Sequence, residues 1–237
     1  SFHLYSEMIS AKKTHVGLVR TENQDSLGHT KLGDNNLFVV CDGVSGLPNG
    51  ALASKTAVDS IISNFSMISS IEPEIHLRST MKKAQKAVMQ ANPKPLGTTV
   101  VALYLVDGTA YTAWCGDSRI YHFRNNILHW MSQDHNILHD LLNKGKSRGN
   151  IFMNPQALNR FFGREFEVEF DYYSFSVEPG DCLLLCSDGL SNYLMEPEII
   201  HAITNNSPQG ASDLMERKLL TKAIGAPDNF TWYIIQI

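Results

Sequence analysis

The chain has 237 residues, of which 43% are apolar, so it can bury one sizeable core, and a single domain spanning residues 1–237 is the simplest expectation. Its 24 acidic and 20 basic residues give a net charge of -4 without a basic run, which argues against nucleic-acid binding. No apolar stretch approaches the ~20 residues of a membrane helix, and residues 1–12 lack the apolar run of a secretion signal. We therefore expect a soluble, cytoplasmic protein.

In chain order, the first half predicts three strands followed by two helices. Apolar, strand-like runs cover residues 14–19, 26–30 and 37–41. Apolar residues then recur at helical spacing over about 50–65 and 73–91, and Pro93 and Pro95 end the second helix.

The second half predicts an antiparallel meander, a short helix and a closing block of strands and helices. The meander comprises 98–106, 109–115, 119–124 and 128–130, with turns at Asp107-Gly108 and Asn125-Asn126. A helix over 133–143 precedes an exposed loop at about 145–155, rich in Gly, Lys, Asn and Ser. Further strands are expected at 168–176, 181–187 and 230–237, and helices at 196–204 and 209–223.

This order of elements predicts an α+β fold. Strands at both ends with two blocks of paired helices favour two packed antiparallel sheets, a β-sandwich, with helices on the outer faces. No regular alternation of strand and helix supports a doubly wound parallel sheet. The four cysteines lie in or beside apolar runs without a CxxC pair, so we interpret them as small buried side chains: Cys41, Cys115, Cys182 and Cys186.

Four aspartates share one local setting, beside an apolar strand-like segment and a turn-forming residue: Asp42, Asp117, Asp188 and Asp228. The preference of Asp for turns explains any one of them. Four together suggest that several strand ends converge. Two like charges roughly 4 Å apart repel by about 1 kcal/mol in water and about 4 kcal/mol at an effective dielectric near 20, so such a cluster must bind protons or a cation. Oxygen ligands select a hard ion such as Mg²⁺ or Mn²⁺.

These segments resemble the metal-dependent protein phosphatase family (PPM, type 2C), particularly its compact bacterial members. The ordered matches cover almost the whole chain: Arg20-Thr21-Glu22-Asn23-Gln24-Asp25, Asp42-Gly43-Val44-Ser45-Gly46, Gly97-Thr98-Thr99, Gly116-Asp117-Ser118-Arg119, Gln133-Asp134-His135-Asn136, Ser187-Asp188-Gly189-Leu190 and Asp228-Asn229-Phe230-Thr231. Each motif alone is weak, but the ordered set is specific.

The resemblance implies two antiparallel sheets flanked by helix pairs, with a two-metal site at one end of the sandwich. It implies that Asp42 bridges both metals and that Gly43 supplies a carbonyl ligand. It assigns Asp188 and Asp228 to the other metal, and Asp117 to a third, weaker one. Arg20 would bind the substrate phosphate, and Asp25 would act through metal-bound water. The loop at 145–155 lies where the family has a flap beside the site.

The implied reaction is hydrolysis of phosphoserine or phosphothreonine in a protein substrate, which would oppose a Ser/Thr kinase. A water bridging the metals would attack phosphorus directly, while the metals and Arg20 offset the phosphate charge. The Arg guanidinium can bind two phosphate oxygens at once. We expect the protein to act as a monomer on phosphoproteins, without nucleic acid or membrane as a partner.

Four residues depart from the family pattern. Val44 stands where some members have His, Asn192 where the family usually has Asp, Gln24 where it often has Glu, and Ser45 where it often has Gly. An amide is a poor ligand for a hard cation, so Asn192 puts the third metal in doubt. His135 and His139 have the helical spacing of metal ligands, but packing or a polar helix face explains them as well.

Two other classes of protein remain open. A catalytically weak relative that binds phosphoproteins would keep these motifs, and the departures at Gln24 and Asn192 leave room for it. A phosphoesterase for small molecules or nucleic acid is the second alternative, although a basic groove is missing.

Overall fold

The computed structural model describes residues 8–65, 72–144 and 157–237. Within these ranges the chain forms strands and helices in this order: β1 (Ile9–His15), β2 (Asp25–Leu32), β3 (Asn35–Asp42), α1 (Gly50–Phe65), α2 (Pro73–Gln90), β4 (Val100–Val106), β5 (Thr109–Cys115), β6 (Arg119–Arg124), β7 (Ile127–Met131), α3 (Ile137–Asn143), β8 (Asp171–Ser176), β9 (Cys182–Cys186), α4 (Asp188–Ser191), α5 (Glu196–Thr204), α6 (Pro208–Thr221) and β10 (Phe230–Gln236).

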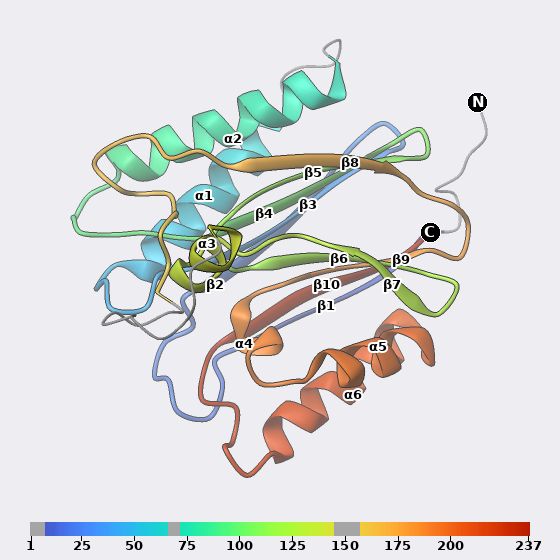
Figure 1. Cartoon of the computed structure of the whole chain (residues 1–237). Helices are drawn as coiled ribbons and strands as arrows, with labels where there is room; N and C mark the ends of the chain where they lie inside the picture. The colour runs from blue at the N-terminus through green and yellow to red at the C-terminus, as the bar shows by residue number, and fades with distance from the viewer. Residues whose placement is uncertain (1–7, 66–71, 145–156) are drawn as a thin grey trace.

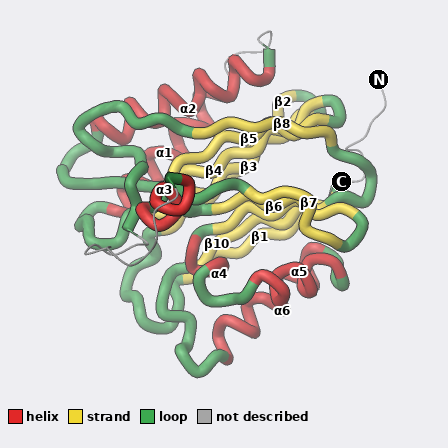
Figure 2. Tube along the Cα trace, in the orientation of Figure 1, coloured by secondary structure: helices red, strands yellow, loops and turns green. Residues whose placement is uncertain are grey.

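The strands form two antiparallel sheets of five strands each, packed face to face (Figure 1). One sheet has the order β2-β3-β4-β5-β8, and the other has the order β1-β10-β9-β6-β7. Figure 2 shows α1 and α2 on the outer face of the first sheet, and α5 and α6 on the outer face of the second. The α+β sandwich with flanking helix pairs predicted from the sequence is confirmed.

Three layers of apolar side chains hold this arrangement together. One lies between the sheets, one between the first sheet and α1 and α2, and one between the second sheet and α5 and α6. Alternation along β3 shows how one strand serves two layers: Val39 and Cys41 face the helices, whereas Phe38 and Val40 face the other sheet. A strand covered on both sides reads as a continuous apolar run, which is why its sequence signal is strong.

The predicted meander is wrong in one respect, because its four strands do not share a sheet. β5 pairs with β4 and β8, whereas β6 pairs with β7 and β9. The chain therefore crosses between the sheets at residues 116–118, where Gly116 adopts φ of 114°. This crossing carries Asp117 to the edge where both sheets end.

The other expectations are met to different degrees. The four cysteines are free, and three of them are buried, as expected for small apolar side chains. The expected loop at 145–155 lies outside the described residues. No helix in the described ranges combines the length and the apolar character needed to cross a bilayer.

Candidate active site

Two of the predicted aspartates meet in the β2–β3 pair. Asp25 begins β2, Asp42 ends β3, and the antiparallel register places the two directly opposite each other. Thr99 fixes this end of β3, since its Oγ1 accepts from Asp42 N at 3.0 Å and its own N–H donates to Asp42 O at 2.8 Å. Side chains of directly paired residues lie on one face, so the two carboxyls are neighbours.

Asp25 joins the two sheets through its carboxylate. Its Oδ2 accepts from Ser187 Oγ at 2.8 Å and from Thr231 Oγ1 at 2.7 Å. Ser187 follows β9 and Thr231 lies in β10, so both donors belong to the sheet opposite β2. The other oxygen, Oδ1, is buried without a hydrogen-bond partner among the described residues. A buried oxygen of this kind needs a proton shared with a neighbouring carboxyl, a water or a cation.

Asp188 reaches the same place from the second sheet. It follows Ser187 at the first position of the short helix α4. The next residue must be glycine, because a Cβ on Gly189 would lie 1.8 Å from Asn229 O. This close packing of α4 against the start of β10 brings Asp188 beside the β2–β3 pair.

Burial and mutual repulsion raise the pKa values of this carboxyl cluster. Burial is the main cause for every member, and it raises the pKa of Asp25 to about 7. The pKa of Asp42 is raised well above its ordinary value by burial and then by the charges of Asp25 and Asp188. The pKa of Asp188 is raised by burial and then by the charge of Asp228, although its hydrogen bond with Asp42 lowers it. Asp25 and Asp188 both act on the pKa of Asp42, so the three carboxyls form one interacting cluster.

Asp117 joins the cluster from the crossing between the sheets. Burial raises its pKa well above the ordinary value, with the charges of Asp188 and Asp134 as further causes. Asp134 itself is held by Arg119, whose Nε and Nη2 each donate to one of its oxygens at 2.8 Å. Asn192 Nδ2 donates to Asp188 Oδ2 at 3.1 Å, so it acts here as a donor rather than as a further anionic ligand.

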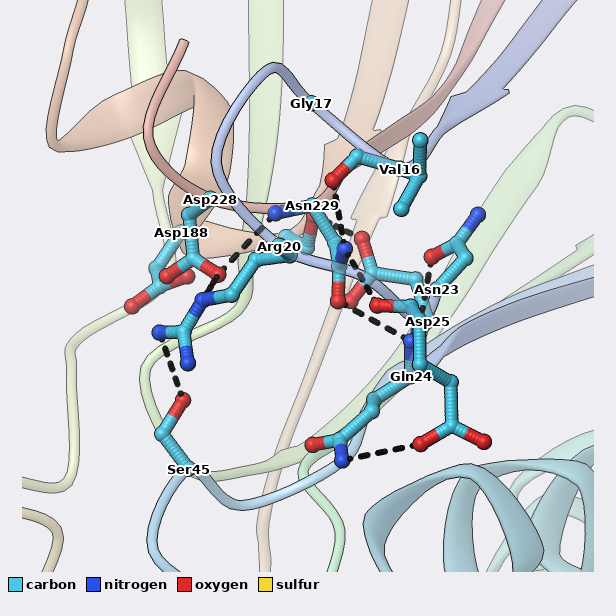
Figure 3. Close-up of polar contacts among 12 residues, drawn as sticks. Val16, Gly17, Arg20, Asn23, Gln24, Asp25, Ser45, Asp188, Asp228 and Asn229 are labelled. Carbon is cyan, nitrogen blue, oxygen red and sulfur yellow. Dashed lines mark hydrogen bonds and ion pairs between the residues drawn. The ribbon is translucent and has the colours of Figure 1, made fainter.

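Arg20 and Asp228 are paired with each other. Arg20 Nε donates to Asp228 Oδ1 at 3.0 Å, and Arg20 Nη2 donates to Ser45 Oγ at 3.3 Å. Figure 3 shows the guanidinium lying between Asp228 and Ser45, with Asp188 close by. Arg20 and Ser45 belong to two different motifs identified in the sequence, and their contact brings the two loops together.

The donor set fits a hard divalent cation, although its present arrangement is not that of a metal site. No group of three His, Cys, Asp or Glu side chains in the described ranges is placed to hold a metal ion. The carboxyls crowd one another, and Asp228 is bonded to Arg20. Their ligand atoms are all oxygens, their charges need neutralising, and Asp25 has an unpartnered buried oxygen. Those are the properties that Mg²⁺ or Mn²⁺ satisfies.

Gly43 extends the cluster with backbone atoms alone. A Cβ at this position would lie 2.5 Å from the Gly50 carbonyl, so the turn into α1 has no room for a side chain. Gly43 N donates to Gln24 O at 3.0 Å, and Val44 N donates to Gly97 O at 2.9 Å. The loop after Asp42 is thus fixed on both sides.

Three polar residues of the site were not assigned a role from the sequence. Ser187 and Thr231 hold Asp25, and the buried Asn229 bonds to the loop that carries Arg20. Their signal in the sequence is that each belongs to a matched motif, within three residues of a predicted aspartate, which gives no role. Their partners belong to distant segments, which spacing along the chain does not reveal.

The pair His135 and His139 does not act together. His135 Nδ1 accepts from Gly116 N at 3.0 Å, and its Nε2 lies 3.1 Å from Asp171 Oδ2. Burial lowers the pKa of His135, which favours the neutral ring. This histidine therefore supports the crossing at Gly116, in agreement with the packing interpretation.

Comparisons with known proteins agree with this geometry. A family model described as "Protein phosphatase 2C" matches residues 19–219. The serine/threonine phosphatase stp of Listeria monocytogenes is 30% identical, over 94% of this chain and 94% of its own. The structure of the serine/threonine phosphatase Stp1 from Staphylococcus aureus is 26% identical with a TM-score of 0.86, covering 100% of this chain and 98% of that one.

A second similar structure shows the fold alone. The catalytic domain of the serine/threonine protein phosphatase PstP, solved in complex with two manganese ions, is 24% identical with a TM-score of 0.79, covering 97% of each chain. The family match spans most of the sequence, including the loop of Arg20 and the motifs of Asp42, Asp117 and Asp188. The chain therefore belongs to the protein phosphatase 2C family and is a protein phosphatase, as its motifs predicted.

Proposed function

We propose that this chain hydrolyses phosphoserine and phosphothreonine in proteins and that it uses two divalent cations, Mn²⁺ or Mg²⁺. The observation that carries the proposal is the crowding of Asp25, Asp42 and Asp188 at one buried edge, to which both sheets contribute. At neutral pH, carboxylates this close stay ionised only with cations between them.

Asp42 would hold both cations, the Gly43 carbonyl one of them, and Asp188 and Asp228 the other. When bound, two such cations would lower the pKa of a water held between them and would offset the negative charge of the phosphate. Asp228 would have to release Arg20 Nε to act as a ligand. The pair is partly exposed, with 44% of the Arg20 side chain accessible, so this exchange costs little.

The residues of the chain supply orientation around that centre. Arg20, released from Asp228, would bind two oxygens of the substrate phosphate through its planar guanidinium. Asp25, held through Oδ2 by Ser187 and Thr231, presents Oδ1 to accept a hydrogen bond from the attacking water. Attack on phosphorus in line with the Ser or Thr oxygen then needs no phosphoenzyme. Val44 has no ionisable group, so we infer that solvent protonates the departing alkoxide.

Two tight cation sites are expected rather than three. Asp117 is the candidate ligand for a third ion, but Asn192 supplies an amide that donates to Asp188. A third ion would therefore bind weakly beside Asp117. Titration calorimetry with Mn²⁺ should give two strong events, and a third of comparable affinity would contradict this part of the proposal.

The cellular role that we propose follows from this chemistry. The enzyme would act in the cytoplasm as a single-domain monomer, with the loop at 145–155 as a flap, and would reverse the action of a Ser/Thr kinase. Gel filtration with light scattering tests the monomer, and phosphoproteome comparison after deletion tests the opposition to a kinase.

The decisive experiment measures phosphate release from phosphoserine and phosphothreonine peptides by the purified protein. Release that rises with Mn²⁺ and stops with excess EDTA supports the proposal. Tight peptide binding without release would favour the catalytically weak relative instead. Faster turnover of nucleotides than of phosphopeptides would favour the small-molecule phosphoesterase.

A further inference from the structure

The loop between β1 and β2, residues 16–24, carries Arg20 to the site, and backbone groups of three of its residues bond to one side chain. Asn229 is 5% exposed and follows Asp228 at the start of β10. Its Nδ2 donates to Val16 O at 2.7 Å and to Glu22 O at 2.9 Å, and its Oδ1 accepts from Gln24 N at 2.9 Å. Both amide protons and the amide oxygen are thus used within this one loop.

These three bonds lie on both sides of Arg20 along the chain. Val16 is on the arm that enters the loop, and Gln24 is on the arm that leaves it (Figure 3). Glu22 precedes Gln24 on that second arm. Asn229 therefore holds the two arms together, and Arg20 lies at the turn between them. The backbone N–H of Asn229 also donates to Asp228 Oδ1 at 2.9 Å, which is the oxygen that Arg20 Nε contacts.

A second contact fixes the same loop against the segment before Asp228. Leu18 N donates to Ala226 O at 2.8 Å, and Gly17 N donates to His15 Nδ1 at 2.8 Å. Gly17 adopts φ of 82°, and a Cβ there would lie 2.3 Å from Asp228 O and 2.7 Å from Ala226 O. The loop is thus pressed so closely against residues 226–228 that only glycine fits at this point.

We propose that Asn229 is a positioning residue: it sets the place of the Arg20 guanidinium relative to the phosphate site without touching the substrate. This inference rests on the proposed role of Arg20 as the phosphate ligand. An Arg side chain has many rotamers, so a fixed backbone on both sides of it limits where its guanidinium can lie. Loss of Asn229 would free the two arms, and Arg20 would meet the phosphate less often in the productive geometry.

The variant Asn229→Ala tests this. We expect KM for a phosphoserine peptide, and Ki for inorganic phosphate as product inhibitor, to rise together by about tenfold or more, with kcat changed less. The Mn²⁺ affinity from calorimetry should stay within about threefold, because Asp228 keeps its bond to the backbone N–H. Unchanged KM and Ki in a folded variant would overturn the inference.

A double-substitution cycle separates positioning from a merely structural role. If Asn229 acts through Arg20, then adding Asn229→Ala to Arg20→Ala should raise KM no further. A second, additive rise would show that Asn229 affects binding by another route, and it would overturn the inference. Arg20→Ala without any effect on KM or Ki would overturn both this inference and the role of Arg20.

Asn36 provides a matched control. It is 2% exposed, its Oδ1 lies 2.9 Å from His29 Nε2, and its Nδ2 donates to Asp34 O at 3.1 Å, all at the opposite end of β3 from Asp42. Asn36→Ala should lower thermal stability and leave KM and Ki unchanged. If Asn36→Ala raises KM and Ki as Asn229→Ala does, the effect comes from a general loss of stability and the inference fails.

Gly17→Ala covers the case in which Asn229→Ala does not fold. It leaves the Asn229 side chain in place but pushes the loop away from residues 226–228, so it should also raise KM and Ki. A folded Gly17→Ala variant with wild-type KM and Ki would count against a loop whose position controls phosphate binding. Failure of the wild-type protein to release phosphate from any phosphopeptide would instead contradict the proposed function, so the two failures are distinguishable.

Discussion

Arg20 is held by a weak internal partner, and this suits a residue that must exchange partners. Its side chain is 44% exposed and that of Asp228 is 19% exposed. A partly exposed pair of this kind contributes about 0–1 kcal/mol, whereas an Arg that binds two oxygens of a phosphate dianion makes two charge-assisted hydrogen bonds. In the proposed role of Arg20, substrate phosphate would therefore displace Asp228 from the guanidinium.

The first prediction concerns Arg20 itself. Arg20→Ala should raise KM for a phosphopeptide by roughly 10- to 100-fold, with a smaller effect on kcat, because uniform binding of the phosphate is lost. Arg20→Lys should recover only part of the loss, since an ammonium cannot form the planar two-oxygen contact. Steady-state kinetics check both, and an unchanged KM and kcat in Arg20→Ala would remove Arg20 from the phosphate site.

The second prediction compares buried aspartates at opposite ends of the sandwich. Asp42→Asn and Asp188→Asn should each abolish metal-stimulated turnover without lowering the thermal stability of the metal-free protein, because each removes a repelling charge. Wild-type turnover in either variant would exclude that residue from the centre.

Asp181 is the control for that comparison. Its Oδ2 lies 2.8 Å from His122 Nε2 and from Arg124 Nη2, and these partners hold its pKa below the ordinary value although burial opposes them. Asp181→Asn leaves a buried pair incomplete and should cost about 3 kcal/mol of unfolding free energy while turnover is kept. When denaturant unfolding and peptide turnover are measured on the same samples, Asp181→Asn should therefore lower the unfolding free energy and keep turnover, whereas Asp42→Asn should lose turnover and keep its stability.

At the scale of single elements, the best-predicted segments are those whose own sequence carries their signal. α1 and α5 begin and end where periodicity places them, because each buries one apolar stripe. β1 spans Ile9–His15 rather than the expected 14–19, since it is an edge strand with Lys12 and Lys13 and is defined by pairing with β10 at the far end of the chain. α4, at Asp188–Ser191, is too short to show a period.

The candidate site likewise contains residues that could be predicted from the sequence and contacts that could not. Asp42 and Asp188 could be predicted, because each lies in a short motif beside a strong strand. The bonds from Ser187 and Thr231 to Asp25 could not, because they exist only after two separately formed sheets stack in one alignment. Asn229 escaped for the same reason: its partners are more than 200 residues away along the chain, at separations of 205, 207 and 213.

The third prediction belongs to α2 and its contact with α1. His76 is buried, stacks on Phe65 at 4.5 Å, and has no partner for Nε2 within the described part of the chain. Burial lowers the pKa of His76 below its ordinary value. As pH falls, this histidine therefore takes up a proton in the unfolded chain before it does so in the folded protein. Stability that is present above the unfolded pKa, near 6.5, is therefore lost as pH falls below it.

His76→Leu should weaken that pH dependence. Between pH 7.5 and 5, the variant should lose less unfolding free energy than the wild-type protein, and the difference is the contribution of this one histidine. Denaturant titration at both pH values measures it. His201, exposed on α5, is the control, and His201→Leu should keep the wild-type dependence. An equally steep loss in His76→Leu would show that this ring does not contribute to acid sensitivity.

At the scale of the whole molecule, the two sheets share one interior. Phe38 and Val40 of the first sheet pack in the same layer as Leu183 and Leu185 of the second. Each outer layer depends on this inner one, because each sheet buries side chains on both of its faces. A chain built in this way should not unfold one half at a time.

The fourth prediction tests the single domain directly. The metal-free protein should unfold in one cooperative transition, with equal calorimetric and van't Hoff enthalpies, and fluorescence and circular dichroism should give the same midpoint. Two separated transitions would show that residues 1–237 comprise more than one cooperative unit.

The link from Asp25 to Ser187 and Thr231 has a consequence for how the enzyme can change over time. With the role proposed for Asp25, catalysis would be sensitive to how one layer is stacked on the other, because a slip between them would pull the acceptor away from both hydroxyl donors. Substitutions on the outward surfaces of the flanking helices leave this alignment untouched and are free to accumulate. Replacements in the shared interior must preserve the interlayer distance, so a loss of turnover can originate in a side chain far from the phosphate.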